Sequence, residues 1–111
     1  MKKFIVARDF SRTPSARTEN EGKNPGEKLR KMIVPLLQEC ISQKEQFIVD
    51  LDGTAGYGTS FLEEVFGGLI REEKFQYQDL KNYLDFISEE EPDIIDEIWQ
   101  DIEDANENET H

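Results

Sequence analysis

Hydrophobic residues follow two patterns along this 111-residue chain: short continuous runs, and stripes with helical spacing. The short runs at 4–7, 46–51 and 84–88 are rich in β-forming residues and predict three strands. Residues 77–83 predict a short helix, and three longer stripes predict amphipathic helices. The stripes consist of Leu29, Met32, Ile33, Leu36, Leu37, Cys40 and Ile41, then Phe61, Leu62, Val65, Phe66, Leu69 and Ile70, then Ile94, Ile95, Ile98, Trp99 and Ile102.

This order of elements predicts an α/β fold. Strands that alternate with helices indicate a small sandwich with a mixed sheet of three to four strands, covered largely on one side by amphipathic helices. The length fits a single domain at 1–105, followed by an acidic polar tail at 106–111 that should fray. Gly67 and Gly68 interrupt the second stripe and should let a neighbouring backbone approach closely.

The charge of the chain is distributed unevenly. The net charge is −12, with +5 on residues 1–44 and −17 on residues 45–111. Nucleic acids and anionic membranes bind clustered Lys and Arg, so neither is a predicted partner. The acidic residues of the second part most simply form a solvated face. A docking surface for a basic partner, or an acidic decoy for a nucleic-acid-binding protein, is the alternative.

Cysteine and histidine usage excludes several chemistries. Cys40 is the single cysteine, so no internal disulfide can form, and its place in a stripe predicts a buried, reduced residue in a cytoplasmic protein. The apolar run near the N-terminus stops at Arg8, which is too early for an export signal or a membrane span. The only histidine is His111, so we expect no Ser-His or Cys-His pair, no zinc cluster and no cofactor.

The middle of the chain carries a motif in which a strand, a glycine-rich loop and a helix follow one another. Residues 50–54 read Asp-Leu-Asp-Gly-Thr and resemble the opening motif of haloacid-dehalogenase-type phosphatases. On that resemblance Asp50 would be the nucleophile and Asp52 the general acid of a Mg²⁺-dependent phosphohydrolase. Only 57 residues follow Thr54, too few for the other catalytic elements, so we expect a non-enzyme and keep a minimal phosphohydrolase as the alternative.

A second resemblance covers nearly the whole chain, residues 4–104. Segments 9–17 and 50–64, together with Gly67-Gly68-Leu69, resemble the STAS-like domain-of-unknown-function family. That family is similar to the STAS domains of anti-sigma-factor antagonists. The resemblance implies a STAS-like sandwich and a regulatory module that binds a protein partner, in particular a histidine-kinase-like ATPase.

The same resemblance points to specific residues. In STAS antagonists the partner kinase phosphorylates a serine at the start of a helix, and the added charge breaks the complex. Arg17 matches a cation of the family's first loop and would clamp a partner's carboxylate or phosphate, or pair internally with Asp50 or Asp52. The expected partner-binding residues, including the possible phosphoacceptors Thr59 and Ser60, are Arg17, Gly53, Gly56, Tyr57, Gly58, Thr59 and Ser60.

The loop glycines also have a plain structural explanation. Gly53, Gly56 and Gly58 are expected to adopt positive φ, which other residues resist. Tyr57 between them is either displayed as a contact or packed against the domain.

Four further side chains of this motif are expected to hold the backbone in place. Asp50 and Asp52 should accept hydrogen bonds from loop amides. Ser60 with Glu63 three residues later predicts a capping box at the start of the helix.

Overall fold

The computed structural model describes residues 1–15 and 25–109. Three strands, β1 (Lys2–Ile5), β2 (Phe47–Asp50) and β3 (Leu84–Ile87), form one sheet in the order β1-β2-β3. Both pairs of strands are parallel, so the α/β class and the lower strand count are confirmed and the expected mixed sheet is wrong. The sheet is parallel because helices connect each strand to the next and return the chain to the same edge.

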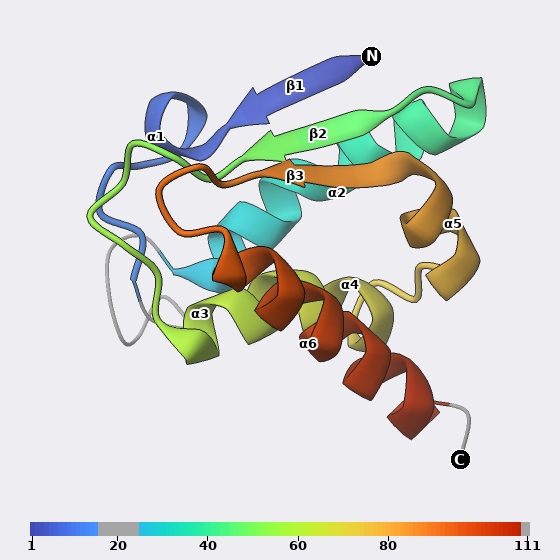
Figure 1. Cartoon of the computed structure of the whole chain (residues 1–111). Coiled ribbons are helices and arrows are strands. Elements are labelled where there is room, and N and C mark those ends of the chain that lie inside the picture. Colours follow the sequence, from blue (N-terminus) through green and yellow to red (C-terminus); the bar gives the residue numbers. More distant parts are fainter. Residues whose placement is uncertain (16–24, 110–111) are drawn as a thin grey trace.

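Helices occupy most of the rest of the chain and gather on one side of the sheet (Figure 1). Their bounds are α1 (Val6–Asp9), α2 (Gly26–Gln43), α3 (Thr59–Leu62), the π-helical segment η1 (Glu63–Gly67), α4 (Gly68–Arg71), α5 (Tyr77–Tyr83) and α6 (Asp93–Glu109). The strands alternate between a buried and a more open face, and Phe4, Val49 and Phe86 all point into the core. The arrangement is a sheet packed against a layer of helices, as the hydrophobic stripes predicted.

Most element bounds agree with the hydrophobic pattern. The helix at 77–83 is confirmed, and the predicted third strand is found at Leu84–Ile87. The first strand lies earlier than predicted, because the amide of Phe10 donates to the carbonyl of Val6 and closes a helical turn there. Residues 106–109 continue α6 instead of fraying, and residues 110–111 lie outside the described part.

The core is built where α6 and the helix that contains η1 meet the sheet. Ile98 and Ile102 of α6 and Phe66 of η1 are completely buried. The Phe66 ring stands edge-on to that of Phe86 in β3, with ring centroids 5.1 Å apart. Cys40 is 3% exposed, so its predicted burial is confirmed.

The glycine pair does not break the second helical stripe. α3, η1 and α4 follow one another without interruption from Thr59 to Arg71. The expected approach of a neighbouring backbone occurs at Gly67, where an added Cβ would lie 3.5 Å from the carbonyl oxygen of Asp101 in α6. At Gly68 the close neighbour is instead a side chain, because a Cβ there would lie 2.6 Å from Nη1 of Arg30. Gly68 therefore makes room for a buried cation.

Arg30 is the centre of an ion network that the sequence did not reveal. The residue is 4% exposed and lies in α2 between two buried positions of the stripe, Leu29 and Ile33. Its guanidinium pairs with the carboxylate of Glu64, donates to the Glu64 carbonyl over 2.7 Å, and donates to Glu73 over 3.0 Å. Burial lowers the pKa of Arg30, but hydrogen bonds with the two glutamates outweigh it and raise the pKa overall.

Candidate functional site

The candidate site lies at the carboxyl edge of the sheet, where all three strands end (Figure 1). The segments that leave this edge are α1, the loop at 51–58 and the turn at 88–91. Binding sites of parallel α/β folds gather at this edge because loops from several strands meet there. The motif at residues 50–54 therefore occupies the place where the fold favours a site.

Two of these loops are fastened to each other by a reciprocal set of hydrogen bonds, which we call the loop clamp. Asp52 accepts hydrogen bonds from the amides of Glu89 and Glu90, each over 3.0 Å. In the other direction Glu90 accepts the amide of Gly53 over 2.7 Å. The clamp comprises Asp52, Gly53, Glu89 and Glu90, and it makes the loop after β2 and the turn after β3 one unit.

Asp50 is held just as closely, at the end of β2. Its carboxylate accepts the amide of Asp52 over 3.0 Å, and Nζ of Lys3 lies 3.6 Å away. Both aspartates of the motif thus engage backbone amides. Among residues 1–15 and 25–109, no group of three or more His, Cys, Asp and Glu side chains is arranged to hold a metal ion.

Tyr57 is turned inward and supports the loop. Its hydroxyl donates to the carbonyl of Leu51 over 2.8 Å, and its ring centroid lies 5.9 Å from that of Phe61. Burial raises the pKa of Tyr57 to about 12, which keeps the hydroxyl protonated as a donor. Of the two interpretations of Tyr57, the structure shows the packed one.

The glycines of the loop differ from one another. Gly53 has φ 89° and Gly56 has φ 122°, so the expected positive φ is confirmed for these two. Gly58 has φ −77° and ψ 153°, which any residue can adopt, so the expectation was wrong there. Gly58 instead occupies the N-cap position of α3.

This difference gives a matched pair of substitutions. Gly56→Ala should lower the free energy of unfolding by about 1–2 kcal/mol, because its Cβ is disfavoured at positive φ. Gly58→Ala should change it by no more than about 1 kcal/mol, since neither position has an atom within 4 Å of an added Cβ. Urea denaturation followed by circular dichroism measures both, and equal losses would contradict the backbone interpretation.

Thr59 and Ser60 form the first turn of α3, and both side chains are exposed. The predicted capping box is wrong, because the helix begins one residue before Ser60 and its N-cap is Gly58, which has no side chain. The Glu63 carboxylate is bound instead by Arg71. The two hydroxyls are therefore surface groups on a helix start and not caps.

Arg17, the expected cation of the first loop, falls in residues 16–24, outside the described part of the chain. Another residue of the first loop, Arg12, does reach the site. The carbonyl of Arg12 accepts the amide of Ala55 over 2.8 Å, which ties the first loop to the motif.

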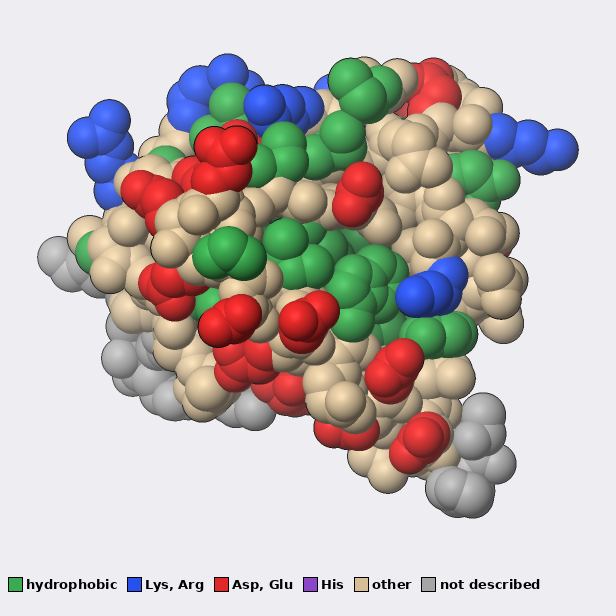
Figure 2. Space-filling view, viewed as in Figure 1, with side chains coloured by type: hydrophobic (Ala, Val, Ile, Leu, Met, Phe, Trp, Pro, Cys, Tyr) green, Lys and Arg blue, Asp and Glu red, His purple; other side chains and the backbone are tan. Residues whose placement is uncertain are grey.

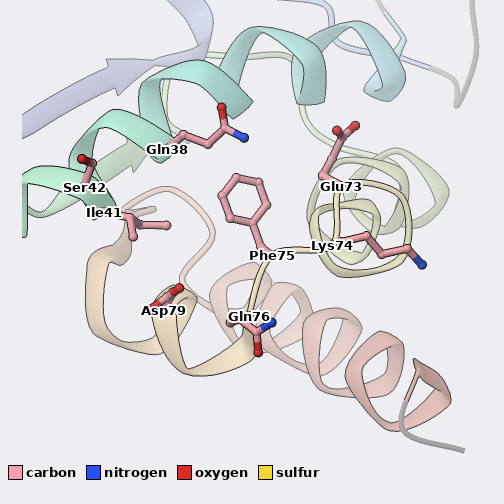
Figure 3. A pocket seen from close by; sticks show the side chains of 8 residues that line it. All are labelled: Gln38, Ile41, Ser42, Glu73, Lys74, Phe75, Gln76 and Asp79. Atoms are coloured by element: carbon pink, nitrogen blue, oxygen red, sulfur yellow. The ribbon is translucent and has the colours of Figure 1, made fainter.

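The cavities differ in size and place. One of about 20 Å³ lies under the loop, between Tyr57, Asp52 and Glu91, with room for about one water molecule. A groove of about 310 Å³ lies between α2, the segment at 73–76 and α5, and the ring of Phe75 points from that segment toward α2 (Figure 3). At the candidate site, the loop thus presents a surface over a cavity too small for a substrate.

A known protein family matches more than half of this chain. Residues 25–93 match the family described as the STAS-like domain of unknown function (DUF4325). The chain belongs to this family. The match includes β2, the motif loop, the helix from Thr59 to Arg71, and β3, so it confirms the resemblance seen at 50–64 and Gly67-Gly68-Leu69. Segment 9–17, which also carried the resemblance, lies outside the matched residues.

Two other comparisons gave no match, and the helices were tested for the ability to span a membrane. Neither the curated proteins nor the solved structures give a match to this chain. Within the described residues, every helix is too short or too polar to cross a bilayer.

Proposed function

We propose that this STAS-like domain is a regulatory module that binds a protein partner through the loop at 53–60 and the helix that follows. The observation that carries the proposal is the pair of exposed hydroxyls, Thr59 and Ser60, at the first turn of that helix. In the STAS antagonists that the chain resembles, a hydroxyl at the matching place is phosphorylated. A histidine-kinase-like ATPase is accordingly the partner class we propose.

The loop before these hydroxyls has the rigidity that a docking surface needs. The loop clamp fixes its first residues, and the hydroxyl of Tyr57 fixes its second part from below. A preformed surface loses less conformational entropy when a partner binds. The hydroxyls are therefore presented by a segment with few alternative shapes.

Phosphorylation at Thr59 or Ser60 would change the electrostatics of this surface strongly. A phosphoryl group adds up to about two negative charges. Residues 45–111, which include the site, already carry a net charge of −17. Because a docked partner would have to exclude water from this added charge, the modified form should bind its partner more weakly than the unmodified form.

The phosphohydrolase alternative has less support from the geometry. Asp52, which would serve as the general acid, uses both carboxylate oxygens to accept the amides of Glu89 and Glu90. Incubating the protein with Mg²⁺ and small phosphate esters tests this alternative. Turnover that Asp50→Asn abolishes would favour the enzyme over the binding module.

The binding proposal predicts that Asp and Ala substitutions at Thr59 and Ser60 have different effects on partner binding. Once a partner has been captured from the native host and identified by mass spectrometry, Thr59→Asp with Ser60→Asp should weaken its binding about tenfold or more. Thr59→Ala with Ser60→Ala should retain binding, and its stability should stay within about 1 kcal/mol, because neither residue is a cap.

A matched control is Ser42→Asp, which adds charge at an exposed position of α2 away from the loop. It should leave partner binding unchanged, and circular dichroism should show the same fold for all variants. Equal binding by the Asp and Ala variants would contradict a regulated hydroxyl.

A further inference from the structure

The sheet has a second face, which no described helix covers (Figure 1). This open face is formed by the residues that alternate with the core positions of the strands. Parallel sheets are almost always covered on both faces, since each strand is then buried on both sides. The open face comprises Lys3, Ile5, Ile48, Asp50, Asp85 and Ile87.

The register of the strands arranges these residues in two rows. The first row runs Lys3, Ile48, Asp85 across β1, β2 and β3. The second row runs from Ile5 of β1 to Ile87 of β3, with an aspartate between them on β2. The isoleucines are only half-buried, and the ends of the first row are exposed and of opposite charge.

The pattern is visible on the surface. Over the strands, in the upper part of Figure 2, basic, hydrophobic and acidic side chains lie next to one another. The face is therefore neither a uniformly charged surface nor a plain apolar patch. Lys3 and Asp85 occupy opposite edges of the sheet, and Asp50 lies on the central strand.

We propose that a second copy of this chain covers the open face, related to the first by a twofold axis parallel to β2. Such an axis places β1 of one copy over β3 of the other and leaves β2 over β2. Lys3 then faces Asp85 of the second copy, and Ile48 faces Ile48 of the second copy. Ile5 faces Ile87 of the second copy in the same way. Each of these pairs therefore joins either two isoleucines or two opposite charges.

Asp50 is the one charged residue of the face that faces its own counterpart in the second copy. Its charge is compensated within each copy, because Nζ of Lys3 lies 3.6 Å from its carboxylate. Lys3 thus lies between the carboxylate of Asp50 in its own copy and the carboxylate of Asp85 in the second copy. Two lysines serve four carboxylates across the interface, and the aliphatic contacts between the rows supply the rest of the attraction.

Edge-to-edge association of the sheets is disfavoured by comparison. The Asp85 carboxylate accepts the amide of Phe86 over 2.9 Å, which occupies a donor on the outer edge of β3. The short strands also limit the size of the face-to-face contact to less than the about 800 Å² per partner of a standard interface. We therefore infer a weak dimer that forms at high protein concentration.

Sedimentation equilibrium of the full chain at rising concentration tests this proposal. The native chain should shift from monomer to dimer, whereas Lys3→Asp or Asp85→Lys alone should raise the dissociation constant about tenfold or more, since each places like charges together twice. An equimolar mixture of these two variants should dimerise again, because every facing pair then has opposite charges. Ile48→Lys, which keeps the charged pairs but puts two lysines on the axis, should also abolish the dimer.

Charge-matched controls are available on other surfaces. Lys28→Asp on α2 and Asp104→Lys on α6 make the same changes in net charge at exposed positions and should leave the dimer intact. A native chain that stays monomeric, or a mixture of Lys3→Asp and Asp85→Lys that fails to recover the dimer, would overturn the proposal.

Discussion

A chain that ends at Glu91, and so lacks α6, should not fold. Ile98 and Ile102 are completely buried and Ile94 is 8% exposed, so removing the helix exposes the core of the domain. Each of these side chains contributes about 1.5–3 kcal/mol through burial, which together approaches the entire stability of a small domain. Circular dichroism should show loss of helical signal and of the cooperative thermal transition.

A second truncation, after Ala105, is the matched control. It removes the half-buried Asn106, the exposed side chains at 107–109, and the surface ion pair between Lys74 and Glu109, whose atoms lie 3.1 Å apart. Such a pair contributes no more than about 1 kcal/mol, so this shorter chain should retain a cooperative transition. An unchanged melting midpoint for the truncation at Glu91 would show that α6 does not stabilise the core.

Replacing the buried cation should have the next largest effect. Arg30→Met removes the counter-charge of Glu64 and Glu73, whose side chains are only 13% and 26% exposed. Removing one partner of a buried ion pair costs about 3–5 kcal/mol, and we expect the lower end because both carboxylates keep some contact with solvent. Urea denaturation measures the loss as a lower midpoint with an unchanged slope.

Arg71→Met is the matched control for that substitution. Arg71 also pairs with two glutamates, Glu63 and Glu72, but its side chain is 35% exposed and water can take over its role. Its loss should cost about 1 kcal/mol or less. Similar losses for Arg30→Met and Arg71→Met would contradict the importance we assign to burial of the Arg30 network.

Hydrophobic periodicity predicted the elements well because each one buries a single face. Ile94, Ile98 and Ile102 of the α6 stripe and Leu84 and Phe86 of the run at 84–88 are buried, and these signals are local in the sequence. The direction of strand pairing is not local, since it depends on how the connecting helices return the chain. The expected mixed sheet was wrong for that reason, although the class of fold was right.

At the candidate site, too, some features could be predicted from the local sequence and others could not. The positive φ of Gly53 and Gly56 follows from glycine chemistry in a tight loop and was predictable. The capping box failed by one residue, because Ser60 lies inside a helix that starts at Thr59. Arg30 escaped notice because a basic residue beside a stripe looks like a surface residue until Glu64 and Glu73 are brought to it by folding. The only local sign was the cation's place between two stripe positions.

The π-helical segment at Glu63–Gly67 has a consequence for how this sequence can change over evolution. A π turn accommodates one extra residue within an α-helix, and the helical stretches on either side keep their directions. Deleting one residue within Glu63–Gly67 should therefore let a regular helix form there, with Gly68 still next to Arg30 and Leu69 still in the core. The same deletion in a regular α-helix would rotate all later side chains by about 100° around the helix axis. The loss of a single residue should accordingly be tolerated better in this segment than in the regular helices of the domain.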